Sequence, residues 1–173
     1  QAPARQAAIH AGIPDSVPCT TVNKVCASGM KAVMQAAQSI ALGENDIMVA
    51  GGMENMSLIP HYTYMRKGVK FGPTGFIDGM QKDGLVDAYD QNAMGVCADA
   101  CAEKYDFSRE EQDTFALQSY DRSAAAWEAG KFNTEVVPVA VPQRRGEPVQ
   151  ITEDEEFKNL RRDKVPALRP AFT

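Results

Sequence analysis

Cys26 stands where a β-branched stretch of the sequence meets an alanine-rich one. Its neighbours Ala27, Ser28 and Gly29 are small, which leaves room for another molecule to approach the sulfur. At the N-terminus of a helix, unpaired N–H groups and a partial positive charge favour the thiolate, which is the nucleophilic form of cysteine. The pattern therefore predicts covalent catalysis by Cys26. The alternative is a small buried hydrophobic residue, as isolated cysteines usually are.

Three successive elements are expected to position Cys26. Residues 20–25 are rich in β-branched side chains and predict a strand. Residues 47–50 form a continuous apolar run, which is typical of a strand buried on both faces of a parallel sheet. Between them, residues 27–42 predict a helix because apolar side chains recur every three or four positions: Met30, Val33, Ala37 and Ile40. Together, the strand, the helix and the second strand would form one right-handed crossover unit of a parallel sheet. This unit would place Cys26 at the carboxyl end of the first strand, where open α/β sheets bind ligands.

The rest of the chain alternates between helical and extended patterns. Residues 3–11 and 95–105 predict helices, and Gly12 is expected to end the first. A capping-box sequence at Ser108–Glu111 opens a longer helix that runs to about Ala129. Residues 135–141 and 149–151 predict a hairpin, with Pro138 indicating an edge strand.

Composition excludes several classes of protein. Hydrophobic residues make up 44% and charged residues 24% of the 173 residues, as in ordinary globular domains. The net charge of −5 argues against nucleic acid as a partner, and no apolar run is long enough to span a membrane. The four cysteines match no zinc-ligand spacing, and their free thiols indicate a reducing compartment. Cys97 and Cys101 are interpreted as packing residues on one helix face.

The string NKVCASGMKA at residues 23–32 resembles the nucleophile motif of the thiolases, in particular of their acetyl-CoA acetyltransferase branch. Five further segments are similar to thiolase segments and follow thiolase order: residues 6–8, 11–14, 49–57, 82–85 and 168–172. The resemblance implies an α/β fold with two parts. Residues 1–55 would belong to the N-terminal catalytic domain, and residues 56–173 to an inserted α/β loop domain that covers coenzyme A.

The resemblance also implies a reaction. Cys26 would be acetylated by one acetyl-CoA, and a second acetyl-CoA would attack the acyl-enzyme to give acetoacetyl-CoA, or the reverse by thiolysis. Coenzyme A thioesters are then substrates, and no tightly bound cofactor is expected. Thiolases take their bases from a Gly-His-Pro motif, an asparagine and a Cys-Gly-Gly motif, whereas His10 and His61 lie in neither context. The chain therefore resembles a thiolase segment without its N-terminus and C-terminal half, and it is expected to be inactive alone.

Coenzyme A contacts follow from the resemblance by position. Matches to the pantetheine channel and its floor are Leu85, Met94, Ala171 and Phe172, for which core packing is the alternative. Matches to the nucleotide-binding end are Asn159, Leu160, Arg161 and Lys164. The family often has histidine in place of Ala93 and arginine in place of Asn159. The phosphate contact is therefore assigned to Arg161 or Arg162.

Three further expectations concern ions and partners. Tyr120 matches a tyrosine of the potassium-stimulated mitochondrial thiolases, so it is either a potassium ligand or a packing residue. A basic cluster at Arg66, Lys67 and Lys70 is either a solvated loop or an attraction for a phosphate-bearing ligand. The resemblance implies a homodimer or homotetramer in a bacterial cytoplasm or a mitochondrial matrix.

Two alternatives remain open at this point. A degradative 3-ketoacyl-CoA thiolase would act on longer chains, but that branch tends to have Arg-Gln-Cys-Ser-Ser-Gly around its nucleophile. Ketoacyl synthases share the fold, but they have neither this motif nor the insertion, which argues against that class. A non-catalytic acyl-CoA- or lipid-binding homologue would leave Cys26 inert toward iodoacetamide, and retention of small neighbours around Cys26 argues against it.

Overall fold

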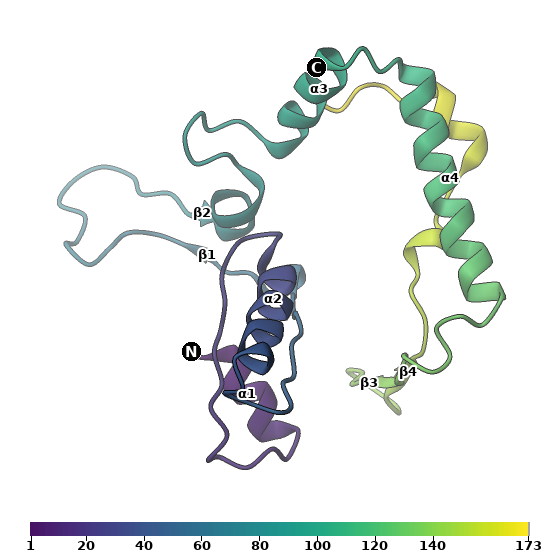
Figure 1. The fold of residues 1–173 in the computed structure, drawn as a ribbon. Helices are drawn as coiled ribbons and strands as arrows, with labels where there is room; N and C mark the ends of the chain where they lie inside the picture. The colour runs from purple at the N-terminus through teal and green to yellow at the C-terminus, as the bar shows by residue number, and fades with distance from the viewer. Residues whose placement is uncertain (173) are drawn as a thin grey trace. The chain divides into compact units, whose positions relative to one another are not determined.

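The computed structural model describes residues 1–172. The chain forms two compact units, Gln1–Ala88 and Tyr89 onward, which are described separately below (Figure 1). The predicted boundary between residues 55 and 56 concerns evolutionary domains rather than compact units, and it stays a prediction. Among the described residues, no helix is long and apolar enough to cross a membrane.

The first unit contains the two helices predicted for it, α1 (Pro3–His10) and α2 (Ser28–Ala41). Each ends at a glycine with a positive φ, Gly12 at 82° and Gly43 at 71°. The N–H of Gly12 donates to the Ile9 carbonyl and that of Ile13 to the Ala8 carbonyl, and the same pattern follows α2. Glycine is favoured here because a left-handed residue lets the last carbonyls of the helix find partners.

The two strands predicted beside α2 are wrong. Residues 20–25 and 47–50 belong to no sheet among the described residues, and Ile47 and Val49 are 85% and 84% exposed. The predicted apolar face of α2 is exposed as well, and Ala36 is the buried hydrophobic residue of the described chain. β-branched residues form a strand only where a neighbouring strand pairs with the backbone, and the described part of this unit places none there.

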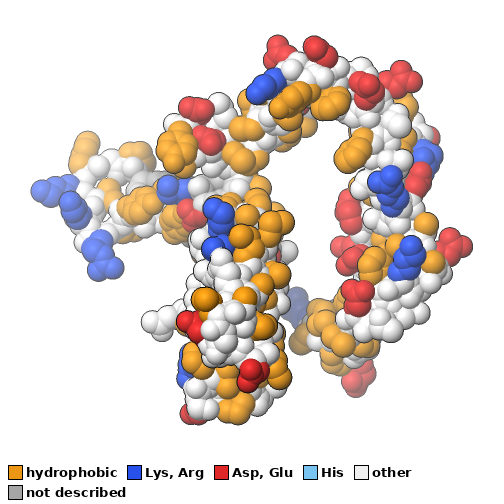
Figure 2. Space-filling model, viewed as in Figure 1, with side chains coloured by type: hydrophobic (Ala, Val, Ile, Leu, Met, Phe, Trp, Pro, Cys, Tyr) orange, Lys and Arg blue, Asp and Glu red, His pale blue; other side chains and the backbone are white. Residues whose placement is uncertain are grey.

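A short hairpin completes the first unit. Strands β1 (His61–Tyr62) and β2 (Ile77–Asp78) pair antiparallel, after η1 (Met56–Leu58) and before a π-helical turn, η2 (Gln81–Leu85). Gly79 follows β2 where a Cβ atom would lie 2.6 Å from the Pro60 carbonyl oxygen, so no larger residue fits without a shift. Lys and Arg side chains gather on the exposed loop between the strands, which carries the predicted basic cluster (Figure 2).

The second unit is organised along one long helix. It contains α3 (Met94–Lys104), α4 (Arg109–Glu128), η3 (Glu156–Lys158) and η4 (Arg162–Ala167). Both η3 and η4 contact α4, and Figure 1 shows this yellow segment running along the helix. The Trp127 ring packs against Phe132 and Phe157, with ring centroids 5.0 and 6.1 Å away. These ring contacts pack the C-terminal end of α4 against the residues that follow it and against η3.

The predicted hairpin of this unit is present but shorter. Strands β3 (Val139–Val141) and β4 (Val149–Ile151) pair antiparallel, and β3 begins directly after Pro138. Proline has no N–H to donate to the hydrogen bonds between strands, which explains why β3 begins only at Val139. The packing prediction for Cys97 and Cys101 is wrong, because both side chains on α3 are exposed.

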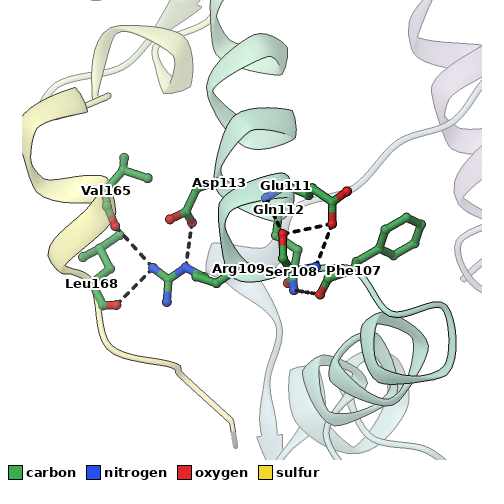
Figure 3. A network of polar contacts seen from close by, with 8 residues as sticks. All are labelled: Phe107, Ser108, Arg109, Glu111, Gln112, Asp113, Val165 and Leu168. Atoms are coloured by element: carbon green, nitrogen blue, oxygen red, sulfur yellow. Dashed lines mark hydrogen bonds and ion pairs between the residues drawn. The ribbon is translucent and has the colours of Figure 1, made fainter.

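The capping box that opens α4 forms as predicted (Figure 3). The Ser108 hydroxyl accepts from the Glu111 N–H at 3.2 Å, and the Ser108 N–H donates to Glu111 Oε2 at 2.8 Å. Donation from the Ser108 backbone and hydroxyl lowers the pKa of Glu111 below its usual value. Two otherwise unpaired N–H groups of the helix start are satisfied in this way.

Replacing the cap should weaken the second unit. We expect Ser108→Ala to lower the free energy of unfolding by about 1 kcal/mol, because one N–H of the first turn loses its partner. Urea unfolding followed by circular dichroism measures the change. Ser119→Ala, in the exposed middle of the same helix, is the matched control and should leave stability unchanged or slightly raised. Equal stabilities of the two variants would contradict the role of the cap.

Candidate functional site

Cys26 lies in a tight turn immediately before α2. The helix begins at Ser28 with Ala27 as its N-cap residue, so Cys26 sits two positions ahead of the first helical residue. Val25, directly before it, has a φ of 49°. This left-handed conformation is unfavourable for a β-branched residue and costs about 1–3 kcal/mol, so it persists only where other interactions hold it.

Five hydrogen bonds hold this turn, one of them from the Ser28 N–H to the Val25 carbonyl at 3.1 Å. The Ser28 hydroxyl donates to the Val25 carbonyl at 2.7 Å and accepts from the Lys24 N–H at 2.8 Å. The Val25 N–H donates to Asn23 Oδ1 at 3.0 Å, and the Ala27 N–H donates to the Lys24 carbonyl at 3.1 Å. Residues on both sides of Cys26 are therefore fixed, and none of these bonds uses its sulfur.

The Cys26 side chain is exposed on this turn. Gly29 has open space where a Cβ atom would lie, so nothing among the described residues crowds the start of α2. An accessible thiol on a backbone turn held by its neighbours is what a nucleophile requires. The structure thus excludes the alternative of a buried packing cysteine.

Residues predicted to contact pantetheine come from both units. Leu85 ends η2 in the first unit and is 41% exposed. In the second unit, Met94 begins α3, and the ring of Phe172 lies against the backbone of Gly95 next to it. A Cβ atom on Gly95 would be 2.0 Å from Phe172 Cε2, so only glycine allows this approach. The fold thus places Phe172 beside Gly95, the residue that follows Met94, and Ala171 directly precedes Phe172 in the chain.

Residues predicted to contact the nucleotide lie between η3 and η4. Asn159 and Arg161 are exposed, whereas Leu160 is half-buried. The Lys164 ammonium, also exposed, lies 3.8 Å from Asp163 Oδ2. Arg162 forms an ion pair with Asp121 of α4, whereas the Arg161 guanidinium makes no hydrogen bond or ion pair with another described residue. Of the two arginines considered for the phosphate, Arg161 is therefore the available one.

Tyr120, the predicted potassium ligand, has a protein partner. Its hydroxyl donates to Glu156 Oε1 at 2.7 Å, which raises the pKa of Tyr120 above its ordinary value. The side chain is half-buried on the face of α4 that contacts η3. The phenol oxygen still has lone pairs that can accept a cation.

Several residues that shape the site had no prominent signal in the sequence. Ser28 and Asn23 hold the cysteine turn, and Arg109 binds the backbone at the end of η4. The hydroxyl and amide near a turn follow a general preference of such side chains for local backbone partners. Nothing local marks Arg109, because its partners lie far along the chain.

The family "Thiolase, N-terminal domain" matches residues 1–173. The chain belongs to the thiolase family. It is 58% identical to "Acetyl-CoA acetyltransferase 2" of Arabidopsis thaliana and 52% identical to "Acetyl-CoA acetyltransferase, mitochondrial" of Bos taurus. These alignments cover 99% of this chain but 43% and 40% of the relatives. The chain thus spans about two fifths of their length.

A solved thiolase has the same fold. The Acat5 thiolase from Ascaris suum, in complex with coenzyme A, superposes with a TM-score of 0.91 at 46% identity, over 100% of this chain and 43% of that one. The predicted thiolase-like α/β fold class is therefore confirmed, although two of its local strands are not. The roles of individual site residues stay predictions.

A hydrogen bond between Tyr62 and Asp83 makes the stability of the first unit depend on pH. The Tyr62 hydroxyl of β1 donates to Asp83 Oδ2 of η2 at 2.7 Å, so it ties the hairpin to the turn that carries Leu85. That hydrogen bond to a carboxylate raises the pKa of Tyr62 from 10.0 to about 12. Because the folded-state pKa is raised, the stabilisation is full below pH 10 and is lost as pH rises through 12.

We therefore expect Tyr62→Phe to be less stable than the wild type below pH 10, with the difference shrinking toward pH 12. Urea unfolding at a series of pH values measures it. Tyr105→Phe, which removes an exposed phenol elsewhere, is the control and should show no such convergence. A difference that stays constant through this range would contradict the Tyr62–Asp83 hydrogen bond.

Proposed function

We propose that this chain supplies the nucleophile and part of the coenzyme A cover of an acetyl-CoA C-acetyltransferase. The observation that carries the proposal is the exposed thiol of Cys26 on a strained turn whose hydrogen bonds leave the sulfur unused. It is supported by membership of the thiolase family and by relatives named acetyl-CoA acetyltransferase.

In the proposed reaction, the Cys26 thiolate attacks the carbonyl carbon of acetyl-CoA. The bond from that carbon to the coenzyme A sulfur breaks, and coenzyme A leaves as a thiolate that takes up a proton. A second acetyl-CoA, deprotonated at its methyl group, attacks the acetyl-Cys26 carbonyl. A carbon–carbon bond forms, Cys26 is released, and acetoacetyl-CoA is the product; thiolysis is the reverse.

Coenzyme A is proposed to bind mainly through the second unit. Met94 and Phe172 offer partly exposed apolar surface to the methylene-rich pantetheine arm. Leu85 is proposed as a pantetheine contact from its match to the family alone. The Arg161 guanidinium binds no other described residue, and Lys164 adds a second cation for the phosphates of the nucleotide. Asn159 and Leu160 would flank the nucleotide between them.

We assign the base for this chemistry to no residue of the segment 1–173. His10 and His61 are both exposed and lie outside the family's histidine motif. The segment therefore depends on groups that it does not contain, and we expect residues 1–173 alone to show no acetoacetyl-CoA cleavage. Substantial turnover by the isolated segment would show that one of its own residues acts as the base.

Covalent labelling tests the nucleophile. We expect radiolabelled acetyl-CoA to acetylate the full-length protein at Cys26, and acetyl-CoA to protect that thiol from iodoacetamide. Peptide mass spectrometry locates the label. Cys26→Ala should remove it, whereas Cys97→Ala, which removes an exposed thiol on α3, should retain it. Label that persists without Cys26, or an inert Cys26, would defeat the proposal and favour a binding protein.

Potassium is proposed to act near Tyr120. The hydrogen bond to Glu156 orients the phenol, and a monovalent cation would bind the oxygen's remaining lone pairs beside that carboxylate. We expect potassium to stimulate the full-length enzyme and Tyr120→Phe to reduce that stimulation, measured as rate against potassium concentration at constant ionic strength. Tyr105→Phe is the control. Undiminished stimulation in Tyr120→Phe would leave Tyr120 as a packing residue.

Assembly and location are proposed from the family alone. The exposed apolar side chains of α2, such as Met30 and Val33, favour a buried contact in a homodimer or homotetramer. Light scattering of the full-length protein measures the assembly, and a monomer would contradict the proposed oligomer.

Residues 1–55 and 56–173 are proposed as catalytic and inserted domains. A bacterial cytoplasm or a mitochondrial matrix is the proposed compartment, and the relatives include proteins named as mitochondrial and one named as cytosolic.

A further inference from the structure

We propose that Arg109 is a positioning residue for coenzyme A, because it fixes the backbone that carries Lys164 on one side and Phe172 on the other. The inference rests on the proposed binding of coenzyme A by these residues. Arg109 itself is not proposed to touch the ligand.

The Arg109 side chain binds two elements at once (Figure 3). It is the first residue of α4, and its Nε atom donates to Asp113 Oδ1 one turn later at 2.8 Å. Its Nη2 atom donates to the carbonyl oxygens of Val165 and Leu168, at 3.2 and 3.0 Å. The planar guanidinium suits this task because its N–H groups point in fixed directions.

These two carbonyls lie where the chain leaves η4. The last carbonyls of a helix have no partner within the helix. A cation that donates hydrogen bonds to them therefore also fixes the direction of the residues that follow. Lys164 directly precedes Val165, and Leu168 begins the stretch that ends at Phe172 on Gly95. One side chain thereby controls the exit of the segment toward the proposed pantetheine contact.

The neighbouring part of the segment is held in a different way. Glu156 is bound by Tyr120, and Arg162 is paired with Asp121, so the stretch before η4 keeps its ties to α4 without Arg109. Beyond Arg162, the described side-chain bonds from α4 to this segment come from Arg109 alone. Its loss should therefore release residues 165–172 and leave residues 156–162 in place.

The test compares the full-length wild type with Arg109→Met, Arg109→Lys and the control Arg122→Met, an exposed arginine on the same helix. We expect Arg109→Met to raise the KM for acetyl-CoA about fivefold, since two charge-assisted bonds of a half-exposed group are lost. The kcat should change less than twofold. Binding of 3′-phospho-ADP, the nucleotide fragment, should weaken less than binding of acetyl-CoA, because Lys164 loses its anchor while Arg161 stays in place through the Arg162–Asp121 ion pair. Arg109→Lys should raise the KM less than Arg109→Met does, because a lysine ammonium can reach one carbonyl but lacks the two-pronged guanidinium that binds both.

Amide hydrogen exchange gives a second readout. Residues 165–172 should exchange faster in Arg109→Met, while residues 156–162 and the whole of Arg122→Met should match the wild type. Unchanged KM and exchange in Arg109→Met, or a loss of kcat with no change of KM, would overturn the inference alone. A wild-type protein that does not bind acetyl-CoA would overturn the proposed function and this inference together.

Discussion

The first unit depends on one side chain, the Ser28 hydroxyl, which bridges the backbone before Cys26. It donates to the carbonyl of Val25 and accepts from the N–H of Lys24, so both groups are satisfied while Val25 stays left-handed. Without that bridge, a β-branched residue would relax to a negative φ and the chain would enter α2 at another angle. The accessibility of Cys26 thus follows from a local strain that its neighbours offset.

The second unit depends in a comparable way on α4. The segment after β4 has little regular structure, since η3 and η4 are short. Its path is set by side chains of the helix: Tyr120 and Asp121 hold one end, Arg109 holds the other, and Trp127 stacks on Phe157. The proposed nucleotide contacts therefore owe their placement to a helix that need not touch the nucleotide.

Features that depend on neighbouring residues were predicted well from the sequence. The four helices were predicted within about a turn, and the capping box and the end of α1 at Gly12 formed as expected, because each is decided by bonds between residues a few positions apart. The predicted strands at 20–25 and 47–50 failed for the opposite reason. A strand is completed by distant backbone, so a β-branched run shows only that a segment can pair.

The sequence by itself determined the helices, their caps and membership of the thiolase family, because these follow from local bonding and from a motif around one cysteine. Only the tertiary structure decided which of two adjacent arginines is free. Arg162 is taken by Asp121, which lies on another element, and Arg161 is not. Likewise, only the fold placed Phe172 on Gly95 and Arg109 on the end of η4. Such contacts join residues far apart in the chain, where local patterns carry no information about the partner.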